Sequence, residues 1–121
     1  MDRIELKVDP AVEAAEAVDE LCSRVPELRA QWEAALEAAS AEKLEALELP
    51  CLALSARPSK NFQVIGMLYK VVCAFLREHE YPRRVVIGCL SEADATMYRQ
   101  IYNFYIPNTK AERMNLSLIH I

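Results

Sequence analysis

The stretch that decides the fold is "CLALSARPSKNFQVIGMLYKVVCAFLREHEYPRRVVIGCL", residues 51–90. Short, continuous apolar runs lie near its two ends, at about 50–56 and 84–90, and such runs are typical of strands buried on both faces of a sheet. Residues 61–80 are apolar on most sides at helical spacing, which predicts a mostly buried helix. A strand, a long helix and a strand in this order predict a βαβ unit with parallel strands and a right-handed crossover.

The residues before this unit predict one more strand and two helices. In "RIELKVD", residues 3–9, apolar and charged side chains alternate, as in a half-buried strand. Asp9 and Pro10 favour a helix start, because a carboxylate caps free N–H groups and proline fits the first turn. The apolar stripe of that helix covers residues 12–25. Alanine and glutamate then favour a second helix from about 28 to 47.

A last helix is predicted to follow the strand at 84–90. Ser91 is expected to cap it, with Asp94 in the capping-box position. Its predicted inner stripe consists of Ala93, Met97, Ile101 and Phe104. A neighbouring stripe consists of Tyr98, Tyr102 and Tyr105. If these tyrosines are exposed they form a candidate face for a protein partner, and if they are buried they cover the sheet.

The predicted order of elements, β-α-α-β-α-β-α, indicates the α/β class. Such a chain folds as layers, with a central, mostly parallel sheet and flanking helices. The length of 121 residues suits one small domain with a core of its own.

Charge and hydropathy narrow the classes of partner. The formal net charge of -4 argues against non-specific binding to nucleic acid or to an anionic membrane. The longest uncharged apolar run, 62–69, is too short to cross a bilayer. Asp2 and Glu5 stand where a signal peptide would be basic. We therefore expect a cytoplasmic or nuclear protein.

The cysteines and histidines do not form a pattern that predicts chemistry. The cysteines are Cys22, Cys51, Cys73 and Cys89. None belongs to a CxxC pair, and His79 and His120 do not complete a zinc site, so we expect four reduced cysteines that pack as small apolar side chains. Cys89 ends a central strand, but acidic residues follow it and oppose a low thiol pKa. No catalytic residue, metal or cofactor is predicted.

The loop between the predicted strand at 50–56 and the long helix is the candidate ligand site. In an open parallel sheet, ligands bind beyond the carboxyl ends of the strands, where the N-terminus of a helix attracts anions. Arg57 and Lys60 would add positive charge there. The candidate ligand-binding residues are Ser55, Arg57, Ser59, Lys60 and Asn61.

The backbone of the same loop argues against phosphate binding on steric grounds. Loops that wrap a diphosphate use glycine for close backbone approach and positive φ, whereas this loop contains Arg57-Pro58 and no glycine. We expect at most one phosphate, held by side chains. The alternative is that Ser59 or Asn61 only caps the helix, while Arg57 and Lys60 are solvated.

The carboxy-terminal half resembles a known family. "VVCAFLREHEYPRRVVIGCLSEADATMYRQIYNFYIP", residues 71–107, resembles the carboxy-terminal part of a macro domain, with an "FL.EH"-type helix end, the last buried strand and an acidic capped helix. "MYRQIYNFYIPNTKAER", residues 97–113, is similar to macro domains of the ganglioside-induced differentiation-associated type. The resemblance covers 27–113, whereas 1–26 looks like a different strand and helix.

The resemblance implies a mixed sheet between helices and ADP-ribose as the ligand; some members of the family also hydrolyse ADP-ribosyl bonds. This chain departs from the pattern in three ways. It has no counterpart of the asparagine- and glycine-rich ligand segments, its phosphate loop keeps Ser55 but loses the glycine, and no residue matches the hydrolytic positions. Only Ser55 and its loop are carried over as a ligand contact.

The end of the chain has two interpretations. "LSLIHI", residues 116–121, resembles translated sequencing-adapter read-through, and with its preceding asparagine it also alternates as a genuine final strand would. The predicted division is therefore 1–26, a macro-like α/β domain at 27–113, and a tail at 114–121.

Three functional hypotheses follow. The first is a non-catalytic macro-like module with a degenerate ADP-ribose site, which acts through protein contacts. The second is a working ADP-ribose binder or ADP-ribosyl hydrolase. The third is a truncated gene fragment, whose sheet would have unpaired edges.

Overall fold

The computed structural model describes residues 3–106, in which short strands alternate with three longer helices. The strands are β1 (Ile4–Val8), β2 (Glu16–Ala17), β3 (Ala46–Leu49), β4 (Leu52–Ala53) and β5 (Arg84–Cys89). The helices are α1 (Val18–Leu21), α2 (Val25–Ala41), α3 (Pro58–Glu78) and α4 (Glu92–Tyr105). Within residues 3–106, no helix combines the length and the apolar character that crossing a membrane requires.

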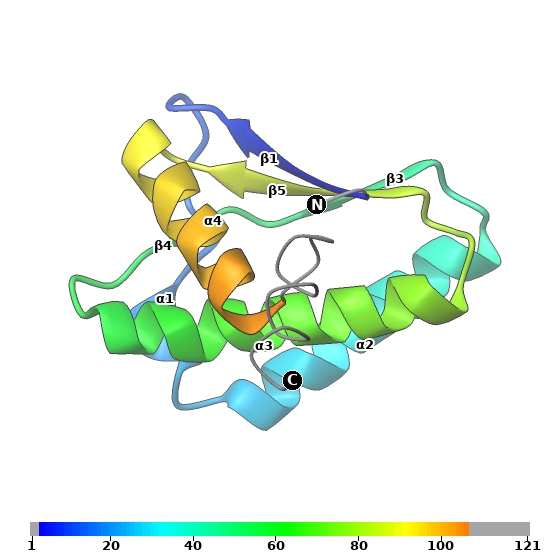
Figure 1. The fold of residues 1–121 in the computed structure, drawn as a ribbon, viewed down its shortest axis with the longest axis horizontal. Helices are drawn as coiled ribbons and strands as arrows, with labels where there is room; N and C mark the ends of the chain where they lie inside the picture. The colour runs from blue at the N-terminus through cyan, green and yellow to red at the C-terminus, as the bar shows by residue number, and fades with distance from the viewer. Residues whose placement is uncertain (1–2, 107–121) are drawn as a thin grey trace, which may run out of the picture.

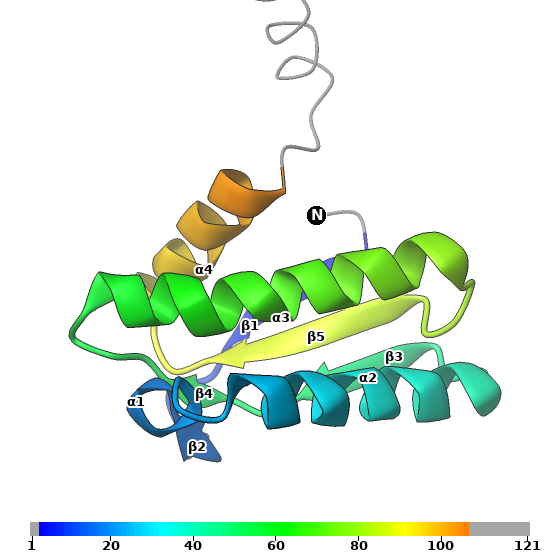
Figure 2. The same ribbon diagram turned by 90° about the horizontal axis from the view of Figure 1, so that it is seen from below.

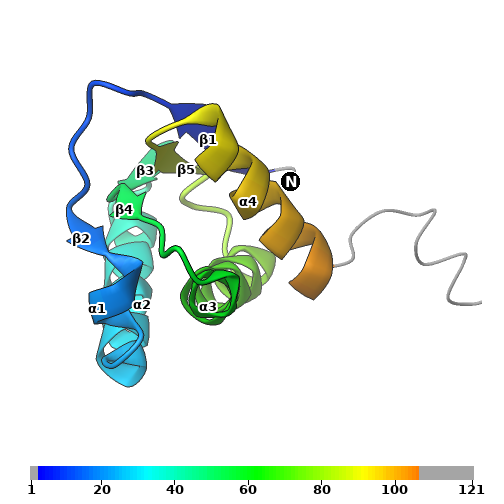
Figure 3. The same cartoon turned by 90° about the vertical axis from the view of Figure 1, so that its left-hand side faces the viewer.

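The main sheet is parallel and has the strand order β1-β5-β3. The longer helices α2, α3 and α4 all lie on one side of it (Figures 1 and 3). Alternating residues such as Val85 and Ile87 are buried against these helices, while Glu5, Lys7 and Glu48 alternate with buried neighbours and are exposed. The predicted α/β class with a parallel sheet and flanking helices is confirmed.

Helix α3 forms the centre of the core, between α2 and α4 (Figure 2). Tyr69 is fully buried on it, and its hydroxyl donates a hydrogen bond of 3.0 Å to the Tyr98 carbonyl oxygen of α4. Gly66 lets α4 come close, because a Cβ there would lie 2.8 Å from Cδ2 of Tyr105. The prediction that this helix is mostly buried is confirmed.

Helix α2 ends earlier than the sequence pattern predicted. It ends at Ala41, whereas the predicted helix continued to 47. Lys43 adopts a φ of 54°, and the N–H of Leu44 donates to the Ala39 carbonyl oxygen over 3.0 Å. This is the Schellman ending of a helix, with lysine where glycine is common. The next residues are therefore free to form a strand.

That strand, β3, takes the place predicted for 50–56 in the main sheet. Leu47 lies beside Val85 and Leu49 beside Ile87, in parallel register. The unit of β3, α3 and β5 is thus the predicted βαβ arrangement, with its first strand earlier in the chain. Of the predicted strand, only β4 is extended, and it pairs with β2 instead.

The predicted first helix was wrong over most of its length. After β1, the N–H of Val12 donates a hydrogen bond to the Asp9 carbonyl oxygen in a turn. The N–H of Ala15 donates to the Cys51 carbonyl oxygen over 2.8 Å. This contact holds the chain extended through β2, so that only α1 remains helical. A long-range pairing therefore overrides the local helix signals of Asp9 and Pro10.

Helix α4 turns inward a face that only partly matches the predicted one, since Ile101 is buried and Met97 half-buried, whereas Ala93 and Phe104 are exposed. Ser91 caps it as expected, since its hydroxyl accepts a hydrogen bond from the Asp94 N–H. Phe104, predicted to be inside, is 69% exposed. The buried residues are Ala95, Tyr98, Ile101 and Tyr102. Tyr98 and Tyr102 therefore lie inside, because their rings pack edge to face against Tyr69.

Arg3 joins the start of β1 to the connection between α3 and β5. Its guanidinium donates to five carbonyl oxygens, those of Leu76, His79, Glu80, Pro82 and Arg83. The contact with α3 itself is 2.6 Å long, from Nη1 to the Leu76 oxygen. The planar fork of arginine suits such a ring of acceptors, and it satisfies carbonyl groups that the end of a helix leaves unpaired.

Replacement of Arg3 by lysine should therefore destabilise the protein although the charge is kept. We expect a loss of about 2 kcal/mol or more in the free energy of unfolding, because several carbonyl groups lose a charged donor. Urea unfolding followed by circular dichroism measures this value. Arg99→Lys, on the exposed side of α4, is the matched control and should change it by less than about 0.5 kcal/mol.

Candidate functional site

The predicted ligand loop is closed by its own amide side chain. Asn61 is 2% exposed and binds both backbone groups of Ser55. Its Oδ1 accepts from the Ser55 N–H over 2.7 Å, and its Nδ2 donates to the Ser55 carbonyl oxygen over 2.9 Å. The amide of Asn61 is therefore engaged inside the protein and ties the strand-side end of the loop to α3.

A carboxylate from another part of the chain meets the polar groups of the loop. The hydroxyl of Ser55 donates to Oδ1 of Asp19 over 2.6 Å, and Nζ of Lys60 lies 3.4 Å from the same oxygen. These contacts lower the pKa of Asp19, first through the Ser55 hydrogen bond and then through Lys60 and Arg57. A negative charge of the protein itself thus lies where the candidate residues would meet an anion.

Ser59 makes none of these contacts, and the guanidinium of Arg57 acts on Asp19 through its charge alone. Both are exposed, and α3 begins without a side-chain cap, so the prediction that Ser59 or Asn61 caps this helix was wrong. The structure brings Ser55, Lys60 and Asn61 together, with the Arg57 N–H bonded to the Ser55 hydroxyl over 3.0 Å. No hydrogen bond or ion pair of the Arg57 guanidinium is seen within residues 3–106.

Asp19 is the residue that the sequence patterns missed. They placed it within a longer helix, whereas α1 is a single turn that packs beside α3. Its position depends on the pairing of β2 with β4, and no local signal in the sequence predicts that pairing.

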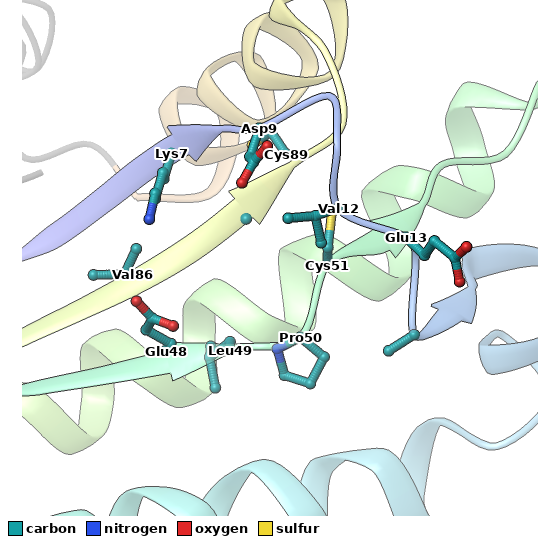
Figure 4. A pocket seen from close by; sticks show the side chains of 12 residues that line it. Lys7, Asp9, Val12, Glu13, Glu48, Leu49, Pro50, Cys51, Val86 and Cys89 are labelled. Carbon is teal, nitrogen blue, oxygen red and sulfur yellow. The ribbon is translucent and has the colours of Figure 1, made fainter.

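A separate pocket lies at the carboxyl ends of the main strands, on the face away from the helices (Figure 4). It has a volume of about 390 Å³. Lys7 from β1 and Glu48 from β3 point toward the space above Val86 of β5. The other lining residues are Asp9, Val12, Glu13, Ala15, Leu49, Pro50, Cys51, Gly88 and Cys89.

The charges around this pocket do not suit a diphosphate. Lys7 is its one lysine or arginine, whereas Asp9, Glu13 and Glu48 supply three carboxylates. Like charges would repel a second anion at this short range. Within residues 3–106, no group of three or more histidine, cysteine or acidic side chains is arranged to hold a metal ion. The pocket can instead receive a small neutral or cationic group against its apolar floor.

The cysteines at the pocket are not activated thiols. Burial, together with the smaller effects of the neighbouring Cys51 and Asp94, raises the pKa of Cys89 to about 11. Burial also raises the pKa of Cys51. Because the thiolate is the nucleophile, both side chains are protonated near neutral pH and behave as apolar wall residues. All four cysteines lie within the described residues 3–106, and each is a free thiol there, as predicted.

Comparison with known proteins adds no relative. No protein-family model matches the chain, and no curated protein and no solved structure matches it. The function is therefore inferred from the residues and geometry of the chain itself. The predicted tail at 114–121 and its two interpretations lie outside the described residues.

The contact between Asp19 and the loop predicts a specific pH dependence. Because the folded pKa of Asp19 lies below its ordinary value of 3.8, the carboxylate stabilises the fold above that pH. This stabilisation is lost as the pH falls through the lower, folded pKa. Asp19→Asn should therefore be less stable than the natural chain at pH 6, and the difference should shrink below pH 3.8.

Urea unfolding at several pH values measures this difference. Glu20→Gln is the control, since it removes one negative charge from the same helical turn without touching Ser55 or Lys60. A stability difference for Asp19→Asn that stays constant from pH 6 to pH 3 would contradict the assigned contact.

Burial of the pocket cysteines predicts slow alkylation. At pH 8, Cys89 should react with iodoacetamide about a hundredfold more slowly than an unperturbed thiol, because its pKa of about 11 leaves little thiolate. Mass spectrometry of the digested protein measures the extent at each cysteine. The same chain in urea is the reference, and equal rates for Cys89 in the two states would refute the burial.

Proposed function

We propose that this chain is a non-catalytic binding module of the macro-like type, whose ADP-ribose site is degenerate. The observation that supports this most is the Asp19 carboxylate, which holds Ser55 at 2.6 Å and Lys60 at 3.4 Å. An anionic ligand at this loop would have to displace a charge that is bonded within the protein. The exchange of one anion for another leaves little net gain in binding free energy.

The backbone of the loop supports the same proposal. Arg57 precedes Pro58, and within residues 3–106 the one non-glycine residue of positive φ, Lys43, lies elsewhere. A loop without glycine and without positive φ does not present a row of N–H groups to a diphosphate. In the macro-like interpretation, this loop is a structural joint between β4, α1 and α3.

Contacts with other proteins remain the proposed mode of action. The tyrosine face was the predicted contact, but Tyr98 and Tyr102 are buried within the chain. A partner on α4 would therefore meet Phe104, which is 69% exposed, and the half-buried Tyr105. The two rings lie 4.9 Å apart, with Phe62 of α3 next to Phe104 at 5.3 Å. Exposed aromatic side chains of this kind are frequent in protein interfaces.

A working ADP-ribose binder is the second candidate. Its support is the uncapped N-terminus of α3, together with the exposed guanidinium of Arg57 beside it. Helix N-termini attract phosphate, and arginine binds it bidentately. In this alternative the ligand would displace the Asp19 carboxylate from Lys60. The hydroxyl of Ser55 would then also be released from Asp19.

Calorimetric titration with ADP-ribose separates the two candidates. We expect no binding in the micromolar range at moderate salt, and no change for Arg57→Ala or Lys60→Ala. Asp19→Asn is the informative variant, because it removes the competing carboxylate and keeps the loop. Micromolar binding that is lost in Arg57→Ala and Lys60→Ala would overturn the proposal. Arg29→Ala, on α2, is the control for the loss of one positive charge.

A further inference from the structure

Strand β1 lies at an edge of the main sheet, and half of its backbone groups point away from β5. The N–H of Val85 donates to the Arg3 carbonyl oxygen over 2.7 Å, and the N–H of Asp9 donates to Cys89 over 2.9 Å. Because backbone groups alternate along a strand, the odd-numbered residues face β5. The N–H and C=O groups of the residues between them, 4, 6 and 8, therefore point away from β5, toward an edge at which no further strand lies within residues 3–106.

The side chains of β1 alternate in the same way. Ile4, Leu6 and Val8 pack toward the helices, while Glu5 and Lys7 are exposed on the other face. The exposed pair carries opposite charges two residues apart. The edge thus offers a backbone that can pair and a charge pattern that selects a register.

We propose that two copies of the chain pair through β1, antiparallel about a two-fold axis at Leu6. In this register the open N–H and C=O groups of Leu6 bond to those of Leu6 in the second copy. Ile4 bonds in the same way to Val8 of the second copy. Glu5 of each copy then lies opposite Lys7 of the other copy, so the two-fold axis produces two such pairs. Both are close, non-hydrogen-bonded pairs on the exposed face. The two sheets join into one.

Other registers of the same edge are less favourable. An axis at Glu5 would place two glutamates opposite each other, and an axis at Lys7 would place two lysines opposite each other. An axis at either end of β1 would leave most of the strand without a partner. The axis at Leu6 uses the full strand and pairs every charge on its exposed face.

The other edge, β3, does not offer the same match. The N–H of Arg84 donates to the Glu45 carbonyl oxygen, so the open backbone groups of β3 belong to residues 46 and 48. An axis at Glu48 would bring two carboxylates together. The pairing is therefore assigned to β1, and it does not depend on whether the loop at Ser55 binds ADP-ribose.

Reversal of one charge tests the pairing directly. Lys7→Glu places Glu5 opposite a second glutamate at both ends of the junction, and it should weaken self-association about tenfold or more. Glu5→Lys should weaken it as well, with the additional loss of the 3.1 Å ion pair to Arg84. The double variant Glu5→Lys/Lys7→Glu restores opposite charges and should recover the dimer. An equimolar mixture of the two single variants should form mixed dimers.

Sedimentation equilibrium of the full chain over a range of concentrations measures the dissociation constants. Lys43→Glu, after α2, changes the net charge by the same amount as Lys7→Glu and is the matched control. Circular dichroism checks that each variant is folded. A natural chain that stays monomeric at high micromolar concentration would overturn the proposal. So would equal dissociation constants for Lys7→Glu and Lys43→Glu, or a double variant that does not recover the dimer.

Discussion

The guanidinium of Arg3 is the contact on which the arrangement of the sheet depends. It binds five carbonyl oxygens between Leu76 and Arg83. These carbonyl groups belong to the end of α3 and to the connection into β5, so Arg3 adds a side-chain link between the first strand and the βαβ unit to the backbone pairing of β1 with β5. With β1 fixed beside β5, the inner face of the sheet matches the buried faces of α3 and α4.

The loop after β4 illustrates how a potential ligand site becomes part of the fold. Lysine, serine and asparagine side chains at the start of a helix are the groups that bind phosphate in many proteins. Here Asn61 is bonded to the backbone of Ser55, and Asp19 neutralises Lys60. The chemistry of each residue type suits both roles, and only the contact from α1 decides between them.

The sequence predicted the elements with long, uniform patterns and missed those that depend on distant contacts. Helix α3 and strand β5 follow from continuous apolar runs, and Ser91 and Asp94 mark the start of α4. The end of α2 was missed because Lys43 adopts a conformation that sequence rules assign to glycine. Arg3 and Asp19 had no local signal at all, since the partners of Arg3 lie 73 to 80 residues away along the chain and those of Asp19 lie 36 and 41 residues away.

The left-handed backbone of Lys43 also bears on how much mutation the chain can absorb. A side chain in this conformation costs roughly 1 kcal/mol relative to glycine, which occupies the region without strain. The backbone of Lys43 closes the helix end through the bond from the Leu44 N–H to the Ala39 carbonyl oxygen, while its side chain is exposed, so glycine could make the same turn without the strain. Replacement of Lys43 by glycine would therefore stabilise the helix end, and this gain could offset destabilising substitutions elsewhere during evolution or design.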